Sequence, residues 1–341
     1  MGRWTRQFSW RHQIMAAALL LGFGSLISPS PAAAQEEIEE PLFKRLRWAR
    51  FELVRGRLEV HDIRRGQNRS ITVNHHELKV REHISFRVDN NELLLHYERQ
   101  GPDESIILDV HGNKLLTLSR IPTSPDQQAV VFHQDRTQVR FQVGGEKGRE
   151  YHAPHLWLMF IEHPDDCHQH LIPLLETLRQ DWHLGRNVET VEANLLRAVH
   201  ATPRIDITFL RQKIEELGSG PYRQRRAADI AIRSMGQGII GILSEIDTHG
   251  MNAEQRLRIQ RICESTIHHT ADTPLSVTSW LKSSPSTWLC LMQHPDRTIR
   301  ELAHRRMALL TDRPIPFHPD ASPSIRERQI AQLRENLDMR R

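Results

Sequence analysis

Cysteine is scarce in this chain of 341 residues, and its three copies lie far apart. Cys167, Cys263 and Cys290 form no Cys-x-x-Cys pair, which excludes a disulfide framework or a zinc ribbon. One disulfide would still be allowed in an oxidising compartment. We expect instead three buried thiols that behave as small apolar side chains.

Catalytic signatures are also lacking. The chain contains no Gly-x-Ser-x-Gly, no Cys/His pairing in a suitable local context, and no glycine-rich loop after an expected strand. The spacing Gly236-x-Gly238-x-x-Gly241 matches a dinucleotide motif by letter only, because it falls between two expected helices. His268-His269 lacks the His-Glu-x-x-His arrangement of a zinc hydrolase. We therefore predict no catalytic residue, no cofactor-binding residue and no cofactor.

The chain also lacks a large excess of charge of either sign. The formal net charge is +4, from 46 Lys plus Arg against 42 Asp plus Glu. Three of the basic residues, Arg3, Arg6 and Arg11, lie in an N-terminal segment that we expect to be removed, which leaves 43 against 42. Aromatic residues do not interleave with the arginines. A nucleic-acid partner is not expected.

The N-terminal segment has the layout of a signal peptide. Three arginines precede an apolar run from Ile14 to Ile27, and small residues at 32–34 suit a signal peptidase. We predict a signal peptide over 1–34, cleavage near Ala34 and a periplasmic or extracellular mature chain without a transmembrane segment. An uncleaved N-terminal anchor is the alternative, although the run is short for a membrane span. An acidic, mobile leader is expected over 35–42.

Residues 43–150 show the period-two alternation of antiparallel strands with one wet face. Turn clusters such as Asp89-Asn90-Asn91 and Gly144-Gly145 separate the segments. This pattern predicts a β-sandwich or meander domain. The apolar pairs and triplets that carry the pattern are Ile71-Val73, Ile84-Phe86-Val88, Leu93-Leu95-Tyr97, Ile106-Leu108-Val110, Val130-Phe132 and Val139-Phe141-Val143.

Near Pro154 the apolar period becomes helical, and we predict a helical domain over 151–341. The first helical spacing is Leu171, Leu174, Leu175 and Leu178. Turns are expected at Gly185, Pro203, Gly218-Ser219-Gly220, His249-Gly250, Pro274, Ser283-Ser284-Pro285 and Pro314-Ile315-Pro316. The fold class predicted for the whole chain is therefore multidomain, β followed by α.

A twelve-residue motif occurs twice in the helical part. Pro-x-x-Trp-Leu-x-x-x-Glu/Gln-His-Pro-Asp begins at Pro154 and again at Pro285, 131 residues later. The offset equals three units of about 44 residues, within the range of two-helix repeats. We expect Trp and Leu to anchor a first helix, His to end it, and Pro-Asp to start a second helix.

A second internal match concerns that second helix. Asp296-x-x-Ile299-Arg300-x-x-Ala303 can be laid over the segment containing Arg225 and Ala228. This pattern resembles the second helix of HEAT-like repeats, over roughly residues 153–312. The resemblance implies an α-solenoid that binds other proteins and has no catalytic residues of its own. It also implies close helix approach at the alanines and links from the arginines to aspartates of neighbouring repeats. A non-solenoid helical domain is the alternative.

Two histidine clusters are candidate metal sites. Cys167, His168 and His170 follow the motif boundary His163-Pro164-Asp165 and offer ligands that suit zinc or copper. His75-His76-Glu77 lies between two expected strands, and we interpret it as a loop tip with exposed histidines. Since exposed histidines and helix-start aspartates are common, no metal ligand is assigned at either place.

The leading functional hypothesis is an exported, non-enzymatic scaffold that binds a protein partner through its helical-repeat surface, with the β domain as a second binding module. The alternative is a metal-binding or metal-dependent hydrolytic envelope protein that uses the cluster near 163–170. Polysaccharide binding by the β domain is compatible with the fold class, but no specific residue supports it.

Overall fold

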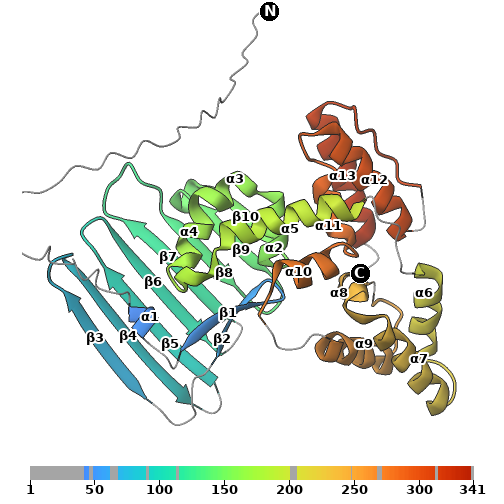
Figure 1. Ribbon diagram of the computed structural model, residues 1–341, viewed down its shortest axis with the longest axis horizontal. Helices are drawn as coiled ribbons and strands as arrows, with labels where there is room; N and C mark the ends of the chain where they lie inside the picture. The colour runs from blue at the N-terminus through green and yellow to red at the C-terminus, as the bar shows by residue number, and fades with distance from the viewer. Residues whose placement is uncertain are drawn as a thin grey trace, which may run out of the picture. The chain divides into compact units, whose positions relative to one another are not determined.

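An antiparallel sheet of eight strands makes up most of the β-rich part of the computed structural model (Figure 1). The structure describes residues 42–45, 49–61, 68–89, 92–112, 115–199, 206–246, 248–266, 271–311 and 314–338. All of them belong to one compact unit that begins at Glu40. The predicted signal peptide and residues 35–41 of the predicted leader lie outside the described residues.

The eight strands follow one another in space in the same order as in the chain, from β3 at one edge to β10 at the other. Every neighbouring pair is antiparallel, so the sheet is a meander. The strands are β3 (Arg69–His75), β4 (Val80–Asp89), β5 (Glu92–Gln100), β6 (Glu104–His111), β7 (Leu115–Pro122), β8 (Val130–Gln134), β9 (Val139–Val143) and β10 (Arg149–Ala153).

A separate hairpin precedes the sheet. Its strands are β1 (Arg50–Val54) and β2 (Arg57–His61), and a short helix, α1 (Leu42–Arg45), comes before them. The two turn residues Arg55 and Gly56 have φ of +56° and +67°, the backbone that a tight two-residue hairpin turn requires. Gly56 is also needed for space, because a Cβ there would lie 2.8 Å from Cδ1 of Trp157.

The rest of the described chain is helical. Its elements are η1 (Gly145–Lys147), α2 (Leu156–Glu162), α3 (Pro164–Asp166), η2 (Cys167–Leu171), α4 (Ile172–Glu176), η3 (Gln180–Trp182), α5 (Leu184–Val199), α6 (Ile207–Glu216), α7 (Tyr222–Ser234), η4 (Gly236–Ile239), α8 (Ile240–Ser244), α9 (Ala253–Thr266), α10 (Pro274–Leu281), α11 (Pro285–Leu291), α12 (Arg297–Thr311) and α13 (Pro323–Asp338). Among the described helices, none is long and apolar enough to cross a membrane.

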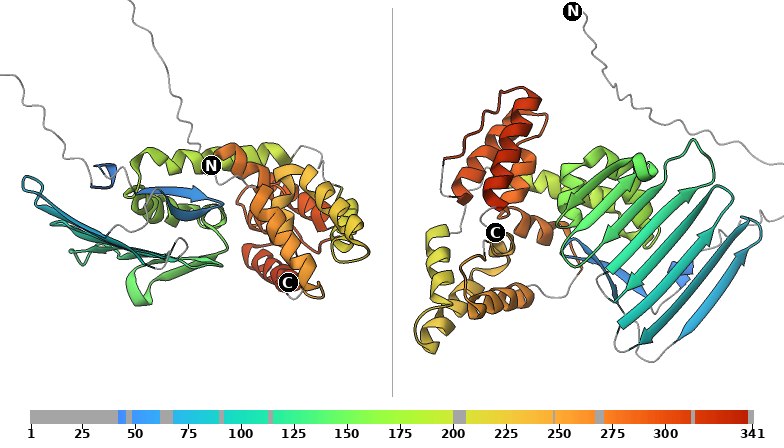
Figure 2. Two further views of the ribbon diagram at one scale, coloured as in Figure 1. Left: turned by 90° about the horizontal axis from the view of Figure 1, so that it is seen from below. Right: turned by 180° about the vertical axis from the view of Figure 1, so that it is seen from behind.

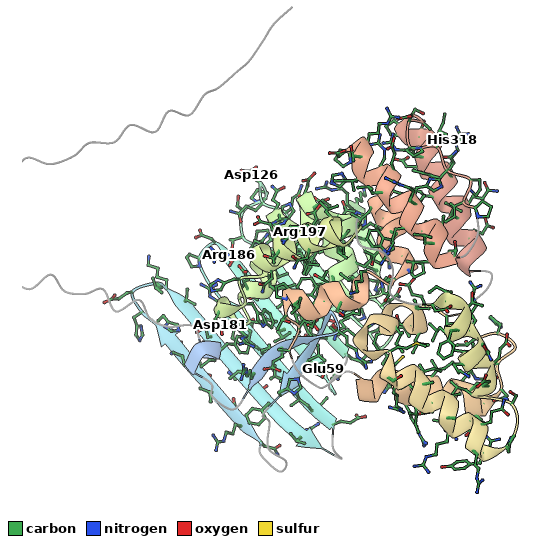
Figure 3. All side chains as sticks on the ribbon, turned by 45° about the vertical axis from the view of Figure 1, so that its right-hand side comes forward. Glu59, Asp126, Asp181, Arg186, Arg197 and His318 are labelled. Carbon is green, nitrogen blue, oxygen red and sulfur yellow. The ribbon has the colours of Figure 1, made fainter. Side chains whose placement is uncertain are left out.

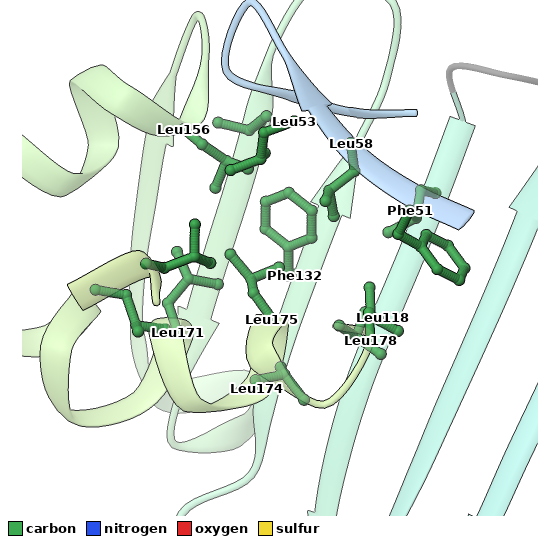
Figure 4. Close-up of a cluster of buried hydrophobic side chains, with 14 of the residues drawn as sticks. Phe51, Leu53, Leu58, Leu118, Phe132, Leu156, Leu171, Leu174, Leu175 and Leu178 are labelled. Atoms are coloured by element: carbon green, nitrogen blue, oxygen red, sulfur yellow. The ribbon is translucent and has the colours of Figure 1, made fainter. Parts of the chain in front are cut away.

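One face of the sheet packs against helices and the hairpin, and this layer forms the main core (Figure 4). Phe132 of β8 is fully buried there among leucines from three sources: Leu58 of the hairpin, Leu156 of α2 and Leu175 of α4. The same core continues into α5 and α10. The helices therefore complete the burial of a sheet face that the strands alone would leave open to water.

The predicted β-then-α order is confirmed, and the sheet is a meander rather than a two-sheet sandwich. The predicted alternation is confirmed too: Leu108, Leu118 and Phe132 occupy one buried row, while their sequence neighbours face the other side. Helical structure begins at Leu156, where the His155 side chain accepts a hydrogen bond from the backbone N–H of Leu158.

Most predicted helix breaks are turns. Gly218-Ser219-Gly220 lies between α6 and α7, and residues 314–316 lie between α12 and α13, whereas Pro203 is outside the described residues. The prediction at Gly185 is displaced: the break falls at His183, whose φ is +48°, and Gly185 is already the second residue of α5. Sequence alone favoured the glycine because it tolerates positive φ more easily.

Candidate functional site

The two copies of the twelve-residue motif form two helices in contact with each other, α2 and α11. Both motif tryptophans, Trp157 and Trp288, are buried, as are the following leucines. Each indole N–H is satisfied, by Oδ2 of Asp272 at 2.7 Å and by the carbonyl of Lys282 at 2.9 Å respectively. The motif thus anchors the helical core.

The end of the motif follows its sequence prediction in the first copy but not fully in the second, where α11 already ends at Leu291, three residues before His294. His163 ends α2, with its N–H bonded to the carbonyl of Met159, and Pro164 starts α3. In the second copy, Asp296 precedes α12 and its side chain accepts a 2.7 Å hydrogen bond from the N–H of Thr298. Pro164 is thus the first helical residue in the first copy, whereas in the second copy Pro295 and Asp296 precede the helix, which begins at Arg297.

A recurring arginine contact marks four helix starts. In each, Nη1 of an arginine at the fourth helical position donates to the carbonyl five residues earlier, just before the helix. This contact gives a hydrogen-bond donor to a backbone carbonyl of the turn before the helix, and it fixes the direction in which the chain enters the helix. The four pairs are Arg225 with Gly220, Arg256 with Met251, Arg300 with Pro295, and Arg326 with Ala321.

These contacts correct one implication of the HEAT-like resemblance. Arg300 was expected to link to an aspartate of a neighbouring repeat, but it donates to the carbonyls of His294, Pro295 and Pro319. The close approach expected at the alanines is consistent with the structure, since Ala228 and Ala303 are fully buried. The sequence did not predict the same contact for Arg256 and Arg326, because its acceptor is a backbone carbonyl, which every residue has.

The cluster near 163–170 does not converge on one point. Residues Pro164 to Glu176 form one helical run whose middle, η2, is a π-type turn directly before Pro173. Cys167 is buried and its thiol donates to the carbonyl of Met159; burial raises the pKa of this thiol. No group of three or more His, Cys, Asp or Glu side chains among the described residues is arranged to hold a metal ion.

The other groups of this cluster have structural partners. His163 stacks on Tyr151 of β10, with ring centroids 4.2 Å apart. Asp166 accepts a hydrogen bond from the Tyr151 hydroxyl and pairs with Arg149 at 2.8 Å. Burial lowers the pKa of His163. It also lowers the pKa of His170, which is less buried than His163. The arrangement ties the helix after the motif to the last strand.

His75 departs from its predicted exposed loop position. It is the last residue of β3, is buried, and its Nε2 lies 2.8 Å from Oε2 of buried Glu82 on the neighbouring strand. The same carboxylate accepts hydrogen bonds from the Tyr97 hydroxyl at 2.6 Å and the Leu42 N–H at 3.0 Å. Of the three cluster residues, only His76 and Glu77 lie in the exposed turn, which continues to Lys79. Because the acidic partner follows seven residues later, across a turn, the local sequence did not reveal it.

The remaining glycine and histidine motifs have simple outcomes. Gly236 and Gly238 lie in η4, between α7 and α8, where no strand precedes them. Gly241 allows close packing, since a Cβ there would lie 2.3 Å from the carbonyl oxygen of Trp280. His268-His269 lies outside the described residues.

The outer side of α7 combines cationic and apolar side chains. Arg223, Arg226 and Ile230 recur at helical spacing and are exposed, opposite the buried Ala228 and Ile232. Ile230 is 57% exposed, and Tyr222 at the start of the helix is 59% exposed. Neither Arg223 nor Arg226 has an ion-pair partner within the described part of the chain. This stripe is the candidate contact surface of the helical part.

The comparisons with known proteins give no relative: no protein-family model, no curated protein and no solved structure matches this chain.

Proposed function

We propose that this chain is an exported, non-enzymatic scaffold that binds a protein partner through its helical part. The observation that carries the proposal is the outer stripe of α7, where Arg223, Arg226 and Ile230 present charge and apolar surface without a partner in the described chain. Exposed apolar side chains framed by arginine are typical of protein contact sites. A partner segment with acidic residues flanking apolar ones complements this stripe.

The rigid setting of α7 supports the same function. Its inner side packs on α6 and α9, and Arg258 of α9 lies between Asp229 of α7 and the Tyr222 ring. A helix held on one side by packing keeps the exposed side chains of the other side in fixed relative positions, which lowers the entropy lost on binding. HEAT-like arrays use stacked helix pairs in this way, and the repeated motif is the feature that suggests such an array here.

The test is cross-linking in cells with a matched pair of double variants. Arg226→Glu with Ile230→Ser changes the α7 stripe; Arg305→Glu with Leu309→Ser makes the same chemical change, at the same spacing, on the exposed side of α12. We expect one reproducible protein cross-linked to the wild type and to the α12 variant, and lost from the α7 variant. Loss from neither variant, or no cross-linked protein at all, would contradict the proposal, provided both variants keep the wild-type circular dichroism.

A further inference from the structure

The sheet face opposite the core carries a polar row that crosses all eight strands. Helices and the hairpin cover only one side of the sheet, and the other side is open in the view from behind (Figure 2). The strand register places one polar side chain from each strand side by side on this open face. In order from β3 to β10 they are Ser70, Ser85, His96, Asp109, Thr117, His133, Arg140 and His152.

This row has the dimensions of an extended ligand rather than of a small molecule. Neighbouring strands lie about 4.8 Å apart, so eight strands span roughly 30 Å. Each strand contributes one hydrogen-bonding group at that interval; none of the eight side chains is aliphatic, and the only aromatic rings are three imidazoles. A linear polymer with a polar group on every unit is the shape that matches.

Cross-strand hydrogen bonds hold three histidines of the open face in one orientation. Nδ1 of His96 lies 2.8 Å from Oδ1 of Asp109, and Nδ1 of His133 lies 3.0 Å from Oγ1 of Thr117. His83, in the adjacent row, has the same arrangement with Thr72 at 2.9 Å. In each case the cross-strand oxygen engages Nδ1, which leaves Nε2 on the opposite edge of the ring and reduces the entropy that binding would cost.

The charge of this face depends strongly on histidine protonation. Its described acidic side chains are Glu92, Glu98, Asp109 and Glu150, and its arginines are Arg81, Arg87 and Arg140, which gives −1 when the imidazoles are neutral. The five histidines of the face, His83, His96, His111, His133 and His152, change this sum to +4 when all are protonated.

We infer that the open face of the sheet binds a linear acidic polysaccharide, and that it does so in mildly acidic surroundings. Carboxylates of the polymer would meet protonated imidazoles and Arg140, while its hydroxyl groups would meet the Ser, Thr and Asp side chains of the row. This surface is separate from the α7 stripe of the proposed function, so either can fail without the other.

The composition of the row favours this ligand over other anions. A membrane surface is met by apolar and aromatic side chains that enter the lipid, and the row has no aliphatic side chain. Exposed Leu115 and Ile121 lie on the same face outside the row, so the vesicle measurement below is the direct test against a membrane. A protein interface concentrates its energy in buried aromatic anchors, which the row also lacks. Evenly spaced hydrogen-bonding groups with switchable positive charge suit a hydrophilic polymer with regularly spaced carboxylates.

The test measures binding of the full-length chain to immobilised polygalacturonate at fixed, low ionic strength. Burial and the neighbouring Arg140 lower the pKa of His133, so this imidazole gains its proton only at a lower pH than an ordinary imidazole does. We expect affinity at pH 5.5 to exceed that at pH 7.5 by about tenfold or more, since the face changes sign. Arg140→Gln should weaken binding at both pH values.

A triple variant, His96→Gln with His133→Gln and His152→Gln, leaves only His83 and His111 to change charge on this face, so its gain in affinity from pH 7.5 to pH 5.5 should fall well below that of the wild type. The control is His168→Gln with His318→Gln, two exposed histidines of the helical part; His318 lies beside α12 and α13 (Figure 3). Equal affinity at both pH values, wild-type binding by the triple variant, or equal binding of neutral dextran would overturn the inference. Binding to anionic phospholipid vesicles without binding to polygalacturonate would assign the face to a membrane and overturn it as well.

Discussion

The indole Nε1 of Trp157 donates a 2.7 Å hydrogen bond to Oδ2 of Asp272, 115 residues later in the chain. The same carboxylate accepts the backbone N–H groups of Arg55 and Gly56 at the tip of the first hairpin, at 2.9 and 2.6 Å. One side chain therefore joins the hairpin, the first motif helix and the segment before α10. The second motif tryptophan, Trp288, has only a neutral carbonyl as its acceptor.

Replacing each motif tryptophan with phenylalanine compares a hydrogen bond to a carboxylate, at Trp157, with one to a backbone carbonyl, at Trp288. Both variants lose one hydrogen bond and a similar volume from a fully buried side chain, and this shared packing cost adds to the hydrogen-bond losses given next. Trp157→Phe leaves a carboxylate short of one donor, so we expect a loss of about 1.5–3 kcal/mol of unfolding free energy, against about 0.5–1.5 kcal/mol for Trp288→Phe. Urea unfolding followed by circular dichroism measures both. Equal losses in the two variants would show that the Asp272 contact has no special weight.

The helix-start arginines differ in burial, which predicts a graded effect of Arg→Lys. Arg300 is buried and donates to three carbonyls, whereas Arg225 is less buried and donates to one. Because lysine lacks the planar fork, we expect Arg300→Lys to cost about 2–4 kcal/mol and Arg225→Lys about 1 kcal/mol. Exposed Arg305 is the control, with an expected change within about 0.5 kcal/mol. Thermal unfolding of the three variants gives the order, and a different order would contradict it.

The buried carboxylate of Glu82 anchors the chain before the first hairpin to the sheet. Glu82→Ala removes the acceptor of Tyr97, His75 and Leu42 together, and we expect a loss of about 3–5 kcal/mol. The matched control is Glu77→Ala in the adjacent exposed turn, with little expected change. Chemical denaturation compares the two. A Glu82→Ala loss no larger than that of the control would mean that the network contributes nothing to stability.

The raised pKa of Tyr97 leads us to expect a lower free energy of unfolding at alkaline pH. Burial, together with the neighbouring Glu82 carboxylate, raises the pKa of Tyr97 far above the ordinary value near 10. The folded chain therefore keeps this proton while the unfolded chain loses it, so the stabilisation is complete below about pH 10 and declines as the pH rises further. Tyr97→Phe should flatten the fall in unfolding free energy between pH 9.5 and 11, compared with the wild type. Tyr222→Phe, at an exposed position, is the control and should leave the fall unchanged.

Local patterns predicted the elements of this fold well, because alternation and helical spacing depend on near neighbours. The apolar triplets around Ile84, Tyr97 and Leu108 identified strands, and those three residues lie side by side in the sheet. The Trp-Leu motif likewise identified two anchoring helices. In each case the sequence pattern and the element that it predicts cover the same short segment of the chain.

What sequence could not reveal depends on register and on backbone acceptors. The polar row exists only once each strand is aligned with the next, since a shift of one residue would turn its side chains to the other face. The burial of His75 depends on Glu82 across a turn, and the role of Asp272 depends on two backbone N–H groups more than 200 residues away. Such partners carry no local pattern.

The meander order has a consequence for how the chain acquires its structure. Each strand of the large sheet pairs with the next one along the chain, so each pairing closes only a short loop and can form as soon as that strand is available. The hairpin that comes first in the chain meets Asp272 only after 216 further residues. We therefore expect the strand pairings of the sheet to form early, and the contact between the hairpin and Asp272 to form late, because it joins distant parts of the chain.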